Sequence, residues 1–404
     1  MPRLILTREE ESTLEGEHGE GAQKAMELLV AVGEAFDAAK MIPVTRAHAA
    51  SSGQEGDLFF VEMLAKGGAR CMIPTTTNPV VNFEYFQNIM DIGEEHAEAS
   101  VAWQVKRYYK EIGAIMSQSC IPYLAENIPQ YGEHVAFSES SATPYVNSVI
   151  GAFTNRESIQ TALAAGMIGK TPEFGLHLQH ERYGTVLVKV ETELKDGYDY
   201  SILGQYVGKK VGNGIPVFEG ITKRPRIDQY INLCAMMNVT GAIPMFYIPG
   251  FTVGAATVKD AFGKDAPRDT ITVGREELKR TEQELQTTTG EISLVMLGCP
   301  HYNLDQIEQV ARLLTGKKFR PGVEFWINTS ATTRIMAERA GYVKALDEAG
   351  ARLITDTCID MFCFNNLRGK TGMTDSPKCA YYKRFGNVRV GSVEECVDAA
   401  VVKG

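Results

Sequence analysis

Residues 292–316 read ISLVMLGCPHYNLDQIEQVARLLTG, and this stretch decides the fold class. An apolar run as long as one strand leads into the short segment 298–301 and then into a run with apolar residues at helical spacing. Residues 323–350 repeat this order, 351–358 supply a third strand, and 387–402 supply a fourth strand with its helix. Strands that alternate with amphipathic helices predict an α/β protein with a parallel sheet flanked by helices.

The predicted strands end in thiol and hydroxyl side chains, which can bind metal ions or substrates. The first ends at Cys299, the second at Ser330 and the third at Cys358, and the following loop leads through Cys363 to Cys379. Ligands of parallel sheets bind beyond the carboxyl ends of the strands, so we expect a catalytic cleft at this edge. Because Gly298 permits a turn and Pro300 cannot extend the hydrogen-bonded ladder, we expect the first strand to end there.

Three thiols from separate loops suit an iron–sulfur cluster or a thiolate-bound metal ion, and three ligands leave a coordination position open for a Lewis acid. One alternative is that each cysteine simply packs in the core. Another is a nucleophile pair of Cys299 and His301, although residues so near in sequence rarely face each other. No C-x-x-C pair occurs among the eight cysteines, so the pattern does not predict a zinc ribbon.

Three other segments are rich in hydroxyl groups and carry an arginine or a histidine. NTSATTR (328–334) combines hydroxyls, the free N–H groups of a helix start and an arginine, a combination that binds carboxylate or phosphate; simple capping by Thr329 or Ser330 is the alternative. VTRAHAASS (44–52) and IPTTTNP (73–79) offer similar chemistry, with solvated loops as the alternative. The candidates in these segments are Arg46, His48, Ser51, Thr76, Asn78, Ser330 and Arg334.

The length of 404 residues predicts two or three domains, and we divide the chain into 1–270, with substrate-binding loops, and 271–404, with the cysteines. We expect the first forty residues to form a helix with Thr7 as N-cap. Residues 120–158 are dense in Pro, Asn, Ser and Gly, and a loop-rich stretch this long is usually functional.

Composition limits the classes of partner. Hydrophobic residues make up 44% of the chain and charged residues 23%, and the formal net charge is −9. This acidic balance argues against nucleic acid, which is bound by clustered Lys and Arg. We find no signal peptide and no apolar stretch of transmembrane length, so we expect a soluble, cytoplasmic protein that does not bind a membrane.

Several motifs together resemble the large-subunit portion of aconitase X. They are LTREEESTLEGEHGEGAQKAMELLVAVGEAF (6–36), IPVTRAH (42–48), PTTTNP (74–79), CIPY (120–123), SESSATPYVNSVIGAFTNRES (138–158), GCPH (298–301), DTC (356–358) and MTDSPKCAYY (373–382). The match runs in order along essentially the whole chain. It implies an aconitase-like multi-domain arrangement and a hydro-lyase activity.

The resemblance implies a cofactor and its ligands. We expect a 2Fe-2S or 4Fe-4S iron–sulfur cluster, or mononuclear iron, held by Cys299, Cys358 and Cys379, with Cys120 of CIPY in reserve. The chain departs from the family pattern near Cys379. Asp375 and Tyr381 stand where many relatives have Asn and His, and the position of Cys379 is not always Cys.

The resemblance also implies a reaction, the loss of water from a small hydroxy acid. We expect cis-3-hydroxy-L-proline, which would give pyrroline-2-carboxylate, because a phosphorylated substrate should draw more clustered basic residues. Mevalonate 5-phosphate is the alternative substrate, and a non-catalytic, metal-binding regulatory protein is the alternative of another class. Family members are closed by a small swivelling domain, so we expect a separate small subunit as partner.

The remaining site residues follow from this reaction. His48, Glu139 and Lys378 are the candidates for proton transfer. Arg46, Ser330 and Arg334 are expected to orient the acid group of the substrate, and Ser51, Thr76, Asn78, Asn147 and Arg156 are expected to complete the pocket.

Overall fold

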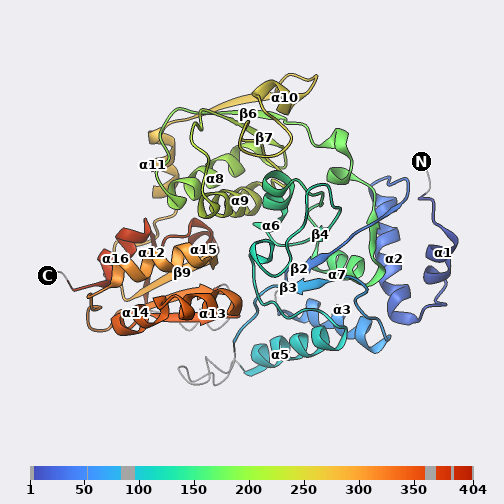
Figure 1. Cartoon of the computed structure of the whole chain (residues 1–404), viewed down its shortest axis with the longest axis horizontal. Helices are drawn as coiled ribbons and strands as arrows, with labels where there is room; N and C mark the ends of the chain where they lie inside the picture. The colour runs from blue at the N-terminus through green and yellow to red at the C-terminus, as the bar shows by residue number, and fades with distance from the viewer. Residues whose placement is uncertain (1–3, 52, 83–95, 360–369, 384–385, 403–404) are drawn as a thin grey trace. The chain divides into compact units, whose positions relative to one another are not determined.

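The computed structural model describes residues 4–51, 53–82, 96–359, 370–383 and 386–402, and the chain forms two compact units (Figure 1). Unit 1 comprises Met1–Val80, Ile92–Tyr183 and Thr252–Gly254, and unit 2 comprises Val81–Asp91, Gly184–Phe251 and Ala255–Gly404. The division that the sequence suggested near residue 270 lies inside unit 2.

Unit 1 contains two groups of paired strands. One is a three-stranded parallel sheet in the order β3-β2-β4, and the other is the antiparallel pair β1-β5. The described elements are α1 (Arg8–Leu14), α2 (Glu20–Ala35), β1 (Met41–Pro43), β2 (Ala47–Ala49), α3 (Glu55–Lys66), β3 (Thr75–Thr77), α5 (His96–Glu111), η1 (Pro122–Leu124), β4 (Ala136–Phe137), α6 (Ala142–Tyr145), η2 (Val146–Ile150), α7 (Ile159–Ile168), β5 (Lys170–Pro172), η3 (Gly175–His177) and η4 (Gln179–Glu181).

The first forty residues form two helices, α1 and α2, where the sequence pattern predicted one. Gly16 and Gly19 between them adopt φ values of +90° and +95°, a conformation that ends a helix and that side chains disfavour. The predicted N-cap is confirmed, because Thr7 Oγ1 accepts a hydrogen bond from the backbone N–H of Glu10 at 3.3 Å. The acidic first turn therefore starts a helix, and the glycines stop it.

Unit 2 contains a three-stranded parallel sheet in the order β7-β6-β8 and a five-stranded parallel sheet in the order β11-β10-β9-β12-β13. Its described elements are β6 (Val186–Val190), α8 (Gly197–Val211), β7 (Pro216–Glu219), α9 (Ile227–Gly241), α10 (Val258–Phe262), β8 (Asp269–Val273), α11 (Arg275–Gln283), β9 (Leu294–Tyr302), α12 (Leu304–Leu314), β10 (Glu324–Thr329), α13 (Ala331–Arg339), α14 (Tyr342–Ala349), β11 (Arg352–Thr355), β12 (Thr371–Thr374), α15 (Pro377–Tyr382), β13 (Asn387–Val390) and α16 (Val393–Ala400).

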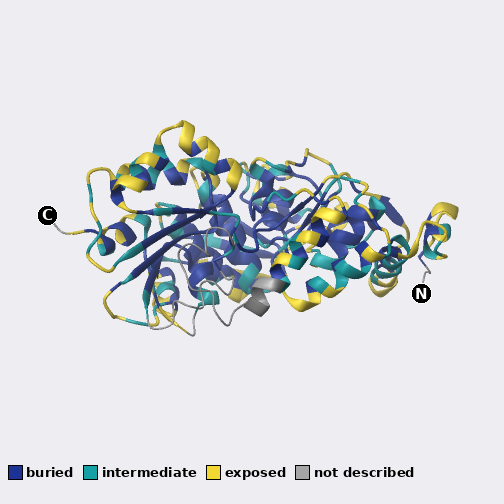
Figure 2. Ribbon diagram, turned by 90° about the horizontal axis from the view of Figure 1, so that it is seen from below, coloured by how far each residue is buried: buried dark blue, intermediate teal, exposed yellow. Residues whose placement is uncertain are grey.

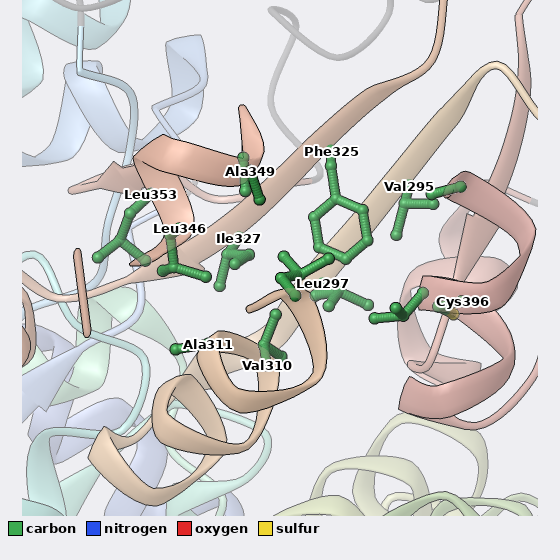
Figure 3. Packing of buried hydrophobic residues seen from close by; sticks show 14 of the residues in the cluster. Val295, Leu297, Val310, Ala311, Phe325, Ile327, Leu346, Ala349, Leu353 and Cys396 are labelled. Carbon is green, nitrogen blue, oxygen red and sulfur yellow. The ribbon is translucent and has the colours of Figure 1, made fainter. Parts of the chain in front are cut away.

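The five-stranded sheet has the alternating order of strands and helices that residues 292–402 predicted. Side chains of β9 and β10, such as Val295 and Ile327, pack against Val310 of α12, Leu346 of α14 and Cys396 of α16 (Figure 3). All nine residues of β9 are buried, as expected for a parallel strand covered on both faces. Buried residues follow the strands, and exposed residues lie on the outer faces of the helices (Figure 2). The predicted α/β class with helix-flanked parallel sheets is confirmed.

The end of β9 differs from the prediction. The strand does not stop at Gly298 but bulges and pairs again with β10 at Tyr302. Between the pairs Ile327↔Leu297 and Thr329↔Tyr302, β10 has one residue, Asn328, whereas β9 has the four residues 298–301. Gly298 adopts φ +89°, and a Cβ there would lie 2.2 Å from the carbonyl oxygen of Asn328. Glycine is thus required for the bulge, which projects Cys299 to His301 from an otherwise regular strand.

None of the helices in the described part of the chain is long and apolar enough to cross a bilayer.

Candidate active site

Three of the predicted site residues of unit 1 lie at the carboxyl edge of the β3-β2-β4 sheet. Ser51 follows β2, Asn78 follows β3 and Glu139 follows β4. All three side chains are buried, with 4%, 8% and 6% of their surface exposed. Because the strands are parallel, their carboxyl ends lie at the same edge of the sheet, and so do these three residues.

His48, in the middle of β2, connects the neighbouring strands. Its Nδ1 lies 2.8 Å from Thr76 Oγ1, and its Nε2 lies 2.8 Å from Asn78 Oδ1. The amide Nδ2 of Asn78 donates to Glu139 Oε2 at 2.6 Å. This contact fixes the amide, so Asn78 presents an acceptor to His48, whose Nε2 must carry the proton. The second carboxylate oxygen, Glu139 Oε1, accepts from Ser140 Oγ at 2.6 Å.

His48 is fully buried, and this burial lowers its pKa from 6.5 to about 4, against the opposing effects of Asn78 and Glu139. The imidazole is therefore neutral at neutral pH. Both ring nitrogens are engaged by Thr76 and Asn78. The geometry makes His48 a residue that orients Asn78, and through Asn78 the carboxylate of Glu139.

The network includes two residues that the sequence reasoning missed. Asn127 donates to the carbonyl oxygen of Ala47 at 2.8 Å and to Thr76 Oγ1 at 2.9 Å. Gln118 donates through Nε2 to the carbonyl oxygen of Asn78 at 3.0 Å. Asn127 belongs to the loop-rich stretch 120–158, which gave a signal for it, whereas Gln118 follows a helix and had no local motif.

Arg46 is not placed at the carboxyl edge. It precedes β2, at the amino end of the strand, and its Nε lies 3.2 Å from Glu133 Oε2. Its Nη1 donates to Asn127 Oδ1 at 3.4 Å. Arg46 therefore contacts the network through Asn127 at the amino end of β2 and does not lie at the edge that holds Asn78 and Glu139.

Asn147 and Arg156 have different surroundings. The side chain of Asn147 bonds both the N–H and the C=O of Thr154, at 3.0 and 2.9 Å, and accepts from the buried Arg182 at 3.0 Å. These contacts hold the backbone of the loop-rich stretch. Arg156 is exposed. Their predicted contact with substrate stays a prediction.

The second group of candidates lies at the carboxyl edge of the five-stranded sheet in unit 2. Cys299 is in the bulge of β9, Cys358 follows β11, and Cys379 is in the first turn of α15, directly after β12. Cys299 and Cys379 are buried, and Cys358 is partly exposed. Parallel topology thus places all three cysteines at the same edge, as predicted.

Two polar side chains tie the cysteine segments together. Ser376 caps α15 by accepting from the N–H of Cys379 at 3.1 Å, and its hydroxyl donates to the carbonyl oxygen of Cys299. His301 lies with Nε2 3.0 Å from the carbonyl oxygen of Thr357, next to Cys358. Because a carbonyl only accepts, this Nε2 carries the proton. Through this bond, His301 links the bulge to the Cys358 segment.

The cysteines have the right chemistry for iron, but their arrangement does not by itself form a ligand set. Within the described ranges, no group of three or more His, Cys, Asp or Glu side chains is placed to hold a metal ion. Cys363 lies outside the described residues. The reserve candidate, Cys120, belongs to unit 1 and is buried, and its carbonyl oxygen accepts from Ser141 Oγ at 3.1 Å.

The other predicted residues of unit 2 have identified contacts. Ser330 caps α13 by accepting from the N–H of Thr333 at 3.2 Å, as the capping alternative predicted. Arg334 donates to Glu338 at 3.0 Å and to the carbonyl oxygen of Leu353 at 2.5 Å. Lys378 is buried, with Nζ 5.8 Å from the ring centre of Tyr382.

Asp375, which departs from the family pattern, forms a buried pair with Tyr302. The phenol donates to Asp375 Oδ2 at 2.5 Å. Burial raises the pKa of this carboxyl from 3.8 to about 7, although the hydrogen bond from Tyr302 opposes the shift. Nearby Asp196 and Glu394 raise it further. The position thus holds a carboxyl group that is half protonated near neutral pH.

Models of one family match in order along the chain. The Aconitase X first domain matches residues 3–180, the second domain 184–283 and the third domain 292–402. The chain belongs to the aconitase X family. The resemblance that the motifs indicated is therefore confirmed.

Aconitase X relatives of two activities match this chain. A phosphomevalonate dehydratase large subunit of Thermococcus kodakarensis is 33% identical, over 98% of this chain and 100% of that protein. A cis-3-hydroxy-L-proline dehydratase of Pseudomonas aeruginosa is 34% identical, over 97% of this chain and 69% of that protein. The crystal structure of Thermococcus kodakaraensis aconitase X in its holo-form matches with a TM-score of 0.88 and 33% identity, over 98% and 100% of the two chains.

These relatives settle the class of protein. The chain is an enzyme, a dehydratase of the aconitase X family, and thus a carbon–oxygen lyase. The alternative of a non-catalytic regulatory protein is not supported. The relatives of the two activities have similar identity to the chain, so identity alone does not select the substrate.

Proposed function

We propose that the chain is the large, catalytic subunit of a dehydratase that converts cis-3-hydroxy-L-proline to pyrroline-2-carboxylate together with a separate small swivelling-domain subunit. The buried His48–Asn78–Glu139 network at the carboxyl edge of unit 1 carries this proposal. It presents the carboxylate of Glu139, whereas Arg46 is paired with Glu133 at the other end of β2. A phosphate dianion would be bound by free Lys or Arg side chains.

Glu139 is the proposed proton acceptor. It removes the proton from the carbon that bears the carboxylate of the substrate, and the C–O bond at the neighbouring carbon breaks. The leaving hydroxide takes up one proton from solvent to form water, and Glu139 then releases the proton that it abstracted to solvent, so that the overall reaction loses one water. The hydrogen bonds from Asn78 and Ser140 hold the carboxylate in one orientation. His48 stays neutral and fixes Asn78, so its proposed part is positioning. The predicted role of Lys378 in proton transfer stays a prediction.

We propose iron, as a cluster or a single ion, for the thiols of Cys299, Cys358 and Cys379, in line with the family. The thiol chemistry of the three cysteines supports this proposal. The hydrogen bonds of Ser376 and His301, which link the cysteine-bearing segments to one another, also support it.

The test is anaerobic co-purification of the chain with its small subunit, followed by iron and sulfide analysis and by assay of cis-3-hydroxy-L-proline. We expect turnover of this substrate, and a Glu139→Gln variant that loses at least ~100-fold in kcat but keeps the iron content. A Cys299→Ser variant should lose both iron and activity. Full iron and full activity in that variant would remove Cys299 as a ligand.

Mevalonate 5-phosphate is the second candidate, because four phosphomevalonate dehydratase large subunits are 33–36% identical to the chain. The same complex is assayed on it. Turnover of mevalonate 5-phosphate alone would replace the proposed substrate. Turnover of neither compound by an iron-loaded complex would overturn both assignments.

A further inference from the structure

Gln118 lies in a segment that runs beside β3 at the candidate active site. The backbone N–H groups of Ile115 and Ser119 donate to the carbonyl oxygens of Thr75 and Thr77, at 2.7 and 3.2 Å. The hydroxyl of Ser117 donates to the carbonyl oxygen of Thr77 at 2.9 Å. These bonds fix the segment along the strand and bring Gln118 to its carboxyl end, next to Asn78.

The orientation of the Gln118 amide follows from its contacts. One end lies 3.0 Å from the carbonyl oxygen of Asn78, which only accepts hydrogen bonds, so that end must be the Nε2 donor. Nε2 also lies 3.2 Å from Thr77 Oγ1. The oxygen Oε1 is therefore directed away from β3. It is buried and has no hydrogen-bond partner among the residues that the structure describes.

Gln118 also has an unfavourable backbone conformation, because its φ of +47° lies in the left-handed region. The side chain is 6% exposed. A buried acceptor without a partner and a left-handed non-glycine residue each cost free energy, and such costs cluster at functional sites. Here both costs fall on one residue that touches the network of Asn78 and Glu139.

The surroundings favour a cationic donor. Asn78 lies between Gln118 and Glu139. Its backbone carbonyl accepts a hydrogen bond from Gln118 Nε2, and its side-chain amide donates one to the carboxylate of Glu139. The negative charge of Glu139 on the same edge favours an ammonium N–H over a neutral hydroxyl. A ring ammonium, as in a proline-like amino acid, supplies such a donor.

We propose that Gln118 Oε1 accepts a hydrogen bond from the protonated amine of the substrate, so that Gln118 selects amino acids over hydroxy acids without nitrogen. This inference rests on the proposed function and deepens it by naming the substrate class. A phosphorylated hydroxy acid has no ammonium group and offers this acceptor only neutral hydroxyl donors.

The test compares two ligands on two proteins by isothermal titration, using the full chain with its small subunit. L-proline carries the amine, and tetrahydrofuran-2-carboxylate has the same ring with oxygen in its place. We expect wild type to bind L-proline roughly 10- to 100-fold more tightly. In Gln118→Leu, which has similar size but no acceptor, this preference should fall at least about tenfold.

Ser117→Ala is the matched control, because it removes a structural hydrogen bond of the same segment and leaves Oε1 in place. It should keep the wild-type preference. The inference is overturned if Gln118→Leu keeps the full preference, if wild type binds the two ligands equally, or if wild type binds neither. Turnover of cis-3-hydroxy-L-proline is measured separately, so selective binding of L-proline without dehydration would refute the reaction and not the role of Gln118.

Discussion

The carboxyl edges of the β3-β2-β4 sheet and of the β11-β10-β9-β12-β13 sheet hold their polar side chains in different ways. In unit 1, side chains bond directly to one another, from Thr76 through His48 and Asn78 to Glu139. In unit 2, bonds that Ser376 and His301 make to backbone atoms link the cysteine-bearing segments. Parallel topology brings residues to an edge in both units, but only direct hydrogen bonds fix how their side chains are oriented.

The two edges also differ in their buried titratable groups. Burial lowers the pKa of His48 to about 4 and raises the pKa of Asp375 to about 7, so each group favours its neutral form. The consequences for stability have opposite signs, because the neutral form of a histidine predominates at high pH and that of a carboxyl at low pH. The following variants test the contribution of each edge to stability separately, from the largest expected effect to the smallest.

Gly298→Ala should have the largest effect. The new Cβ would lie 2.2 Å from Asn328 O, at a φ of +89°, so both overpacking and backbone strain oppose it. We expect the free energy of unfolding in urea to fall by about 2–5 kcal/mol. Gly322→Ala is the control, because its φ is +80° but no heavy atom lies within 4 Å of the added Cβ. Equal losses of unfolding free energy in the two variants would show that the short distance between residue 298 and the carbonyl oxygen of Asn328 is not what requires glycine in the bulge.

His48→Leu should destabilise the protein by about 2–4 kcal/mol at pH 7, because Thr76 and Asn78 lose their buried partner. Urea unfolding measures the loss. His180→Leu, at a side chain that is 72% exposed, should change stability by less than about 0.5 kcal/mol. A similar effect of both variants would contradict the role of the network.

The same variant gives a pH test. The pKa of His48 is about 4 in the folded chain and 6.5 in the unfolded chain, so the unfolded chain binds more protons between these values. Wild type therefore loses stability as pH falls from 6.5 to 4. The advantage of wild type over His48→Leu should shrink by up to about 3 kcal/mol across this window. An advantage that is constant with pH would show that His48 is not buried in its neutral form.

Asp375→Asn should show the opposite trend. The folded pKa of about 7 exceeds the unfolded value of 3.8, so this carboxyl contributes stability fully below pH 3.8 and loses it as pH rises through 7. Relative to wild type, the variant should gain roughly 2–3 kcal/mol between pH 5 and pH 8, measured by urea unfolding. The exposed Asp265→Asn is the control and should show no such gain. A variant that parallels wild type at every pH would contradict the raised pKa.

Ser376→Ala should have the smallest effect on stability, about 1 kcal/mol, as for the loss of a helix cap. Ser392→Ala removes the cap of α16 and should cost a similar amount. Only Ser376→Ala should speed alkylation of Cys379 and Cys299, measured by mass spectrometry, because Ser376 bonds both segments. Equal alkylation rates in the two variants would contradict the conclusion that the hydrogen bonds of Ser376 hold the two cysteine segments together.

Much of unit 2 was predictable because its pattern is local. The alternation of strand and helix after residue 292 and the cap at Ser330 follow from residues next to each other in sequence, as does the cap at Thr7 in unit 1. The end of β9 was predicted wrongly, because Pro300 does not reveal that β10 pairs again at Tyr302. Gln118 was missed because its left-handed backbone and its contact with Asn78 depend on a strand far away in sequence.

The sequence by itself determined the α/β class, the aconitase X family and, except at β9, the strand ends near which the candidate residues stand, since these depend on periodicity and on motifs. Only the tertiary structure decided that His48 is buried between Thr76 and Asn78, that Arg46 pairs with Glu133 away from the carboxyl edge, and that Gln118 presents a buried acceptor. The physical reason is that burial and hydrogen-bond partners come from neighbours in space, and these set the protonation state and the orientation of a side chain.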